Sequence, residues 1–176
     1  MSFELAETVQ RAQDGDKKAF AQLYSLVYKD MYRLALLNLG HEADASDVVS
    51  DTVLEGYTKI RQLREPTAFK AWLTAILTAN INKKLREYVR DRNFREDIDD
   101  YGDTAADEKT DIQNTVGGLT LQNAMQRLTE EERQVLSLST VSGYTSEEIA
   151  EITGIAANTV RSKISRAKEK LRKMME

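Results

Sequence analysis

The stretch TSEEIAEITGIAANTVRSKISRA, residues 145–167, decides the fold of this 176-residue chain. Its first four residues form a capping box, in which a threonine hydroxyl serves one free amide of a helix start and a glutamate reaches back. Ala150 is small enough for two helices to cross closely, and Gly154 tolerates the positive φ that a tight turn needs. Val160 places a branched apolar side chain where the second helix must be pinned to the first. The stretch therefore predicts a helix-turn-helix.

The exposed side of the second helix carries polar and basic side chains that suit duplex DNA. Arginine, asparagine and serine can reach base edges in the major groove, and further cations, from Lys163 to the tail at Lys173, hold phosphates. A plain helical hairpin with a solvated basic face is the alternative, but the cations sit on the predicted recognition helix, so we favour DNA binding. The candidate contacts are Asn158, Thr159, Arg161, Ser162, Lys163, Ser165 and Arg166.

Charge is segregated along the chain, although the formal net charge is −4. Basic residues dominate 158–173 and 81–95, whereas acidic residues crowd 96–111. A chain arranged in this way can offer basic faces to nucleic acid and still be acidic overall. The same segregation separates a basic DNA-reading end from an acidic connecting segment.

Several functional classes find no support in the sequence. Cysteine is absent, which excludes disulfides and thiolate metal sites and fits a cytoplasmic protein. No apolar run approaches the roughly 20 residues that span a bilayer, and the first residues do not resemble a signal peptide. The single histidine, His41, has no identifiable catalytic partners, and the acidic residues lack calcium-loop spacing. We therefore expect no enzyme activity, no metal and no cofactor.

The chain divides into three parts in an all-α arrangement. Residues 1–92 form one small helical domain, residues 93–117 an acidic flexible linker, and residues 118–176 the helix-turn-helix domain. Gly40 is the expected C-terminal cap of a first long helix, and residues 44–47 supply N-cap candidates for the next. Trp72 lies on an apolar stripe and is expected in the core. A second capping box begins at Thr129.

Both ends of the chain resemble the extracytoplasmic-function (ECF) subfamily of the sigma-70 family RNA polymerase sigma factors. The sequences 124–136, 144–155 and 159–171 are similar to region 4 of these proteins. The sequences 15–24, 32–35, 44–49 and 69–86 are similar to region 2, including its acidic motif and its promoter-reading helix. The resemblance covers nearly the whole chain in the family's order.

The resemblance implies a division of labour between the two domains. The first domain would bind core RNA polymerase through Asp47, Val48, Asp51 and Thr52. With the loop 61–67, it would capture the melted minus-ten strand of promoter DNA through Asn80, Lys83, Lys84 and Arg86. The recognition helix would read the minus-thirty-five element, and the acidic linker would run toward the polymerase active centre. An anti-sigma factor and a stress or envelope response are further expectations.

The sequence also allows two alternative functions. A helix-turn-helix regulator that binds duplex DNA without becoming a polymerase subunit shares the C-terminal motif, but it has no reason to carry the first domain. A pure protein-interaction module, such as a protein that sequesters sigma factors, has no use for a basic recognition helix.

Overall fold

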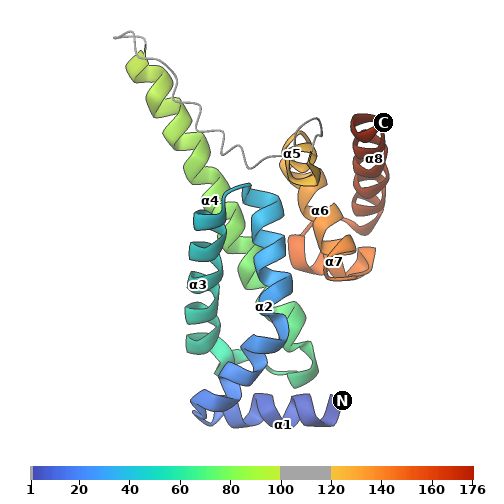
Figure 1. Ribbon diagram of the computed structural model, residues 1–176. Helices are drawn as coiled ribbons and strands as arrows, with labels where there is room; N and C mark the ends of the chain where they lie inside the picture. Colours follow the sequence, from blue (N-terminus) through green and yellow to red (C-terminus); the bar gives the residue numbers. More distant parts are fainter. Residues whose placement is uncertain (1, 100–119) are drawn as a thin grey trace.

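The structure is a computed structural model that describes residues 2–99 and 120–176, and all regular structure in these ranges is helical (Figure 1). This confirms the all-α prediction. The first domain contains α1 (Ser2–Gln13), α2 (Lys17–Leu39), α3 (Glu42–Lys59), η1 (Ile60–Gln62), η2 (Pro66–Ala68) and α4 (Phe69–Asp99); the second contains α5 (Leu121–Gln126), α6 (Glu130–Thr140), α7 (Ser146–Thr153) and α8 (Ala157–Met175).

The turn between α2 and α3 is tighter than the sequence suggested. Gly40 caps α2 in the left-handed region, with φ of 78°, as predicted. The N-cap prediction at residues 44–47 is wrong, because α3 already begins at Glu42 with His41 as its N-cap. No side chain caps this start. Instead, Glu42 and Asp44 place negative charge in the first turn, where the helix dipole favours it.

The core of the first domain lies between α2, α3 and α4. Leu23, Met31 and Leu73 are among its largest fully buried side chains, and Trp72 packs against them half-buried. The helix α1 was not predicted, although Val9 and Ala12 share one face of it and are buried. These two residues are three positions apart, a spacing that could have revealed the helix.

The helix α4 continues past the predicted domain boundary at residue 92. It runs to Asp99, so residues 93–99 of the expected linker are helical and extend it beyond the other helices (Figure 1). Charge-rich composition did not prevent this, because the helix was already nucleated and each added residue gains a backbone hydrogen bond. The rest of the predicted linker, residues 100–117, lies outside the described residues.

The second domain follows the prediction closely. Both capping boxes are present, with Thr129 and Glu132 at the start of α6 and an equivalent pair at the start of α7. Gly154 ends α7 in the left-handed region with φ of 77°. Ile149 of α7 and Val160 of α8 are completely buried, so the two helices are held together as a helix-turn-helix.

The two domains pack directly against each other, with α6 beside α2 and α7 beside α4 (Figure 1). Polar pairs mark the contact. Asn38 donates from Nδ2 to Ser137 Oγ at 3.0 Å, and Gln134 donates from Nε2 to Asn82 Oδ1 at 2.9 Å. The hydroxyls of Thr74 and Tyr144 lie 3.0 Å apart. Apolar residues of both domains join in one continuous core, so this is a closed arrangement of the two domains.

Candidate nucleic-acid interface

The outer face of α8 is open to solvent. Val160 and Ala167 are buried on its inner side, and one helical turn contains 3.6 residues, so the opposite side points away from the protein. Six of the seven predicted contacts are exposed there: Asn158, Thr159, Arg161, Ser162, Ser165 and Arg166. The predicted recognition residues therefore share one accessible surface, as major-groove reading requires.

Several of these side chains are pre-positioned by neighbours. Arg161 pairs with Glu147 of α7 and donates to Asn158 Oδ1 at 2.7 Å. Arg166 donates to the carbonyl and hydroxyl of Ser162, both at 3.3 Å. Such contacts restrict the arginine rotamers before DNA arrives, which lowers the entropy lost on binding. Glu147, however, competes with phosphate or base for Arg161.

Two of the cations expected to hold the DNA backbone are engaged within the protein. Lys163 is half-buried and pairs with Glu131 of α6 at 2.7 Å. Lys170 contacts both carboxylate oxygens of Glu132, at 2.8 and 2.9 Å. Burial alone raises the pKa of Glu132, but Lys170 and the Thr129 amide more than offset it, so that this pKa lies below its ordinary value. Lys170 thus fastens α8 to α6, which the sequence pattern did not reveal.

The predicted minus-ten residues lie on different sides of α4. Lys83 and Arg86 are exposed. Asn80 is half-buried and donates from Nδ2 to Thr52 Oγ1 at 3.1 Å and to Glu55 Oε2 at 3.2 Å. Lys84 pairs with Asp44 at 3.6 Å and Glu87 at 3.3 Å. The structure therefore brings only Lys83 and Arg86 of this set to open solvent as cations, while Asn80 and Lys84 join α4 to α3.

The predicted polymerase-binding residues of α3 require a correction. Asp47 and Asp51 are exposed, but Val48 and Thr52 face the core and are buried. Residues spaced three or four apart share one face of a helix, so the acidic face continues to Leu54, which is 66% exposed. Leu54 was not among the residues predicted from the sequence, because an apolar residue in a helix resembles a core residue. Leu54 lies seven residues after Asp47, a spacing of about two helical turns, and this spacing could have placed it on the same face of α3.

Two other kinds of site are absent from the part of the chain that the structure describes. No helix there is long and apolar enough to cross a membrane. Nor does any group of three or more histidine, aspartate or glutamate side chains within residues 2–99 and 120–176 stand where it could hold a metal ion. The exposed face of α8 is thus the best-formed candidate surface.

Together, the fold and this surface define a class: a two-domain, all-α protein with a helix-turn-helix that binds DNA.

Comparison with known proteins gives the family. Residues 19–93 match the model "Sigma-70 region 2", and residues 119–171 match "Sigma-70, region 4". The chain is 28% identical over 162 residues to the ECF RNA polymerase sigma factor SigM of Mycobacterium tuberculosis, covering 92% of this chain and 79% of the relative. It is 28% identical over 186 residues to the ECF RNA polymerase sigma factor SigW of Bacillus subtilis, covering 99% of this chain and 98% of the relative.

A solved structure agrees with these matches. The sigma factor RpoE of Bartonella quintana, in complex with the anti-sigma factor NepR, has a TM-score of 0.70 and 27% identity, covering 89% of this chain and 96% of that chain. The chain belongs to the sigma-70 family of RNA polymerase sigma factors, in its ECF subfamily.

Proposed function

We propose that this protein is a transcription initiation factor that joins core RNA polymerase and directs it to a specific set of promoters. One observation carries the proposal: two helices with exposed cations, α4 and α8, lie in the domains that match regions 2 and 4. Each can serve a separate DNA element. The polymerase supplies the chemistry, so the protein itself needs no catalytic group, and it acts in the cytoplasm where the polymerase works.

Within this function, we assign roles to the accessible residues. The outer face of α8, centred on Ser162, Ser165 and Arg166, reads duplex DNA at the minus-thirty-five element. Lys83 and Arg86 follow the backbone of the melted minus-ten strand. The acidic face of α3, with Asp47, Asp51 and Leu54, docks on the polymerase. Asn80 contributes to strand capture only after it leaves its bonds to Thr52 and Glu55.

A duplex-binding regulator that is not a polymerase subunit is not favoured. Its function would not require the first domain, which matches region 2 over residues 19–93. We also propose an anti-sigma partner, since the similar chain from Bartonella quintana was solved with one. The inducing signal, a stress or envelope response, stays a prediction.

In vitro transcription with purified core polymerase tests the proposal. The wild-type chain is expected to confer promoter-specific start sites on the core enzyme. Replacing Arg161 and Arg166 together by alanine should reduce transcription by at least tenfold without weakening core binding, because each good base contact contributes about 1–3 kcal/mol. The matched control replaces Lys17 and Lys18, two exposed lysines at the start of α2, and should keep near-normal transcription.

Two results would contradict the proposal. One is a wild-type chain that never associates with core polymerase. The other is a double arginine variant that transcribes as well as the double lysine control, which would remove α8 from promoter reading.

A further inference from the structure

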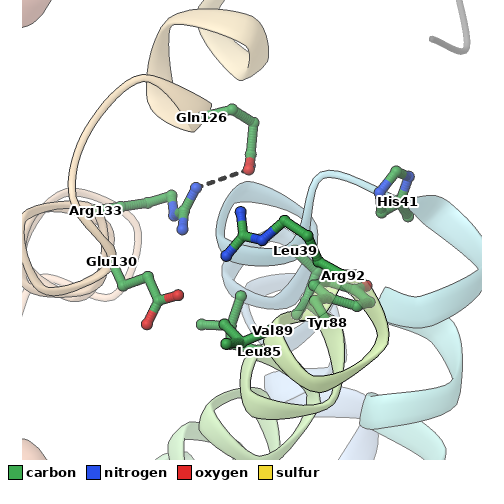
Figure 2. A pocket seen from close by; sticks show the side chains of 9 residues that line it. All are labelled: Leu39, His41, Leu85, Tyr88, Val89, Arg92, Gln126, Glu130 and Arg133. Carbon is green, nitrogen blue, oxygen red and sulfur yellow. Dashed lines mark hydrogen bonds between the residues drawn. The ribbon is translucent and has the colours of Figure 1, made fainter. Parts of the chain in front are cut away.

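A hollow of about 360 Å³ lies between the two domains. Figure 2 shows its walls, which come from α2, α4, α5 and α6, so that neither domain forms it alone. Leu85 and Val89 of α4 supply apolar surface, and polar side chains from both domains point inward. None of these residues took part in the proposed function.

Arg133 of α6 is the first unusual feature of the hollow. The residue is only 5% exposed, and its guanidinium donates from Nη1 to Gln126 Oε1 at 2.7 Å. Its Nε has no hydrogen-bond partner among the described residues, and none of their carboxylates lies within 4.0 Å of it. Leaving a buried charge without a counter-ion is unfavourable, because its lost hydration is not replaced. Burial accordingly lowers the pKa of Arg133, although Glu130 opposes this effect.

A second guanidinium enters the same space from the other domain. Arg92 of α4 extends toward Gln126 and Arg133 in Figure 2. Gln126 holds Arg133 in place, because it accepts from Arg133 while its own Nε2 donates to the carbonyl of Leu37 at 2.9 Å. Two like charges that converge beside apolar walls repel each other, and an anion placed between them relieves the repulsion.

The carboxylate of Glu130 does not provide that anion. It is the only acidic side chain among the described residues that line the hollow, and it is not within ion-pair distance of either arginine. Glu130 instead stabilises the start of α6, because it lies in the first turn, where the helix dipole favours negative charge. The described lining therefore carries two arginines, a buried Arg133 and an exposed Arg92, against one glutamate.

We propose that this hollow binds a small phosphorylated anion, held by Arg92 and Arg133 beside Gln126. Arginine forks match phosphate oxygens in geometry, and a surplus of positive charge favours a dianion over a single carboxylate. The volume exceeds that of one phosphate group, so pyrophosphate or the phosphate of a small ester fits the space. Because the arginines belong to different domains, the bound anion stabilises the closed arrangement of the two domains.

Calorimetric titration of the full-length chain with inorganic pyrophosphate, at constant ionic strength, tests the site. Replacing Arg92 by glutamine should weaken binding by at least tenfold, because a charge-assisted hydrogen bond is lost. The matched control is Arg90→Gln, which removes the same charge from an exposed position on α4 outside the hollow. It should change affinity by less than about twofold. Equal losses in the two variants would mean general charge attraction and would overturn the proposal, as would a wild-type chain that binds no pyrophosphate.

A change of the opposite sign sharpens the test. Glu130→Gln removes the one acidic side chain of the described lining and should tighten pyrophosphate binding severalfold. Glu131→Gln changes the neighbouring position of α6, outside the hollow, and should leave affinity nearly unchanged. Glu130, Glu131, Arg90 and Arg92 are all exposed, so these variants keep their fold. The titration needs neither polymerase nor promoter, so it is decided independently of the proposed function.

Discussion

Positions 154 and 56 both favour glycine, but for different physical reasons. Gly154 has φ of 77°, and a Cβ added there would meet no neighbouring atom within 4 Å, so any cost of substitution is conformational. Gly56 lies inside α3, where an added Cβ would come within 2.6 Å of Leu73 Cδ1, a buried core atom. One position is limited by backbone geometry and the other by packing between α3 and α4.

Substitution of the two glycines should therefore give opposite rankings. At Gly154, alanine is expected to destabilise the protein by about 1–2 kcal/mol, and asparagine by less, because asparagine tolerates the left-handed region. At Gly56, asparagine is expected to cost more than alanine, because it is larger and polar in a packed contact. Urea unfolding of the four variants measures both orders, and an identical ranking at the two sites would refute this explanation.

The ion pair between Lys170 and Glu132 makes a prediction about pH. The folded-state pKa of Glu132 lies below its ordinary value of 4.5, so the pair contributes stability above pH 4.5 and loses it as pH falls through the lower, folded-state pKa. Lys170→Met should cost about 1 kcal/mol at pH 7 and progressively less below pH 4.5. Lys168→Met, an exposed change on the same helix, is the control. A Lys170→Met deficit that persists at low pH would point to lost packing.

At the scale of single helices, the exposed face of α3 carries the proposed docking surface. Asp51→Lys together with Leu54→Ala should weaken core-polymerase binding by at least tenfold, since both exposed side chains are changed and the core is untouched. Ser46→Lys, another exposed change on α3, should leave binding nearly intact. Fluorescence anisotropy of the labelled chain with core enzyme measures the affinity. If the double variant and the Ser46→Lys control bound core polymerase with similar affinity, this face of α3 would not be the docking surface.

The helices of the second domain were predictable because their signals are local. Capping boxes, Gly154 and the apolar positions of α8 each act within a few residues, and local chemistry decides them. The side chains of α3 and α4 were harder to assign. Whether Val48 or Asn80 faces solvent depends on how α3 meets α4, which periodicity constrains only loosely. The extension of α4 to Asp99 was missed because the linker was predicted from its acidic composition, and composition does not determine where a helix ends.

The pocket formed by Arg92 and Arg133 could not have been found in the sequence. The two residues are 41 positions apart and meet only because α6 packs against the first domain. Each arginine alone resembles an ordinary surface cation. The two arginines approach each other only in the closed arrangement of the domains, and no sequence motif around either arginine specifies that arrangement.

At the scale of the whole molecule, the closed arrangement is too small for a promoter. Elements centred near minus ten and minus thirty-five are about 25 base pairs apart, or about 85 Å at 3.4 Å per base pair. A compact chain of this length has a radius of gyration of about 16 Å. The proposed function therefore predicts that the domains separate before α4 and α8 reach both elements together.

Distance measurements between spin labels test this opening. The chain has no cysteine, so Lys29→Cys and Lys168→Cys introduce the only two labelling sites, one in each domain. The free protein should give one short distance, and the complex with core polymerase and promoter DNA should give one longer by tens of ångströms. An unchanged distance in a transcribing complex would contradict the opening.

The buried contact between Asn38 and Ser137 is one of several that hold the two domains together, and it is imperfectly satisfied. Asn38 Oδ1 has no hydrogen-bond partner among the described residues, and burying such a group costs about 1–3 kcal/mol. A pair of leucines at the same contact would instead have stabilised it. The Asn38–Ser137 pair therefore contributes less to the stability of the closed arrangement than an apolar pair would. A partner that binds the open form more tightly than the closed form therefore has less interdomain adhesion to overcome.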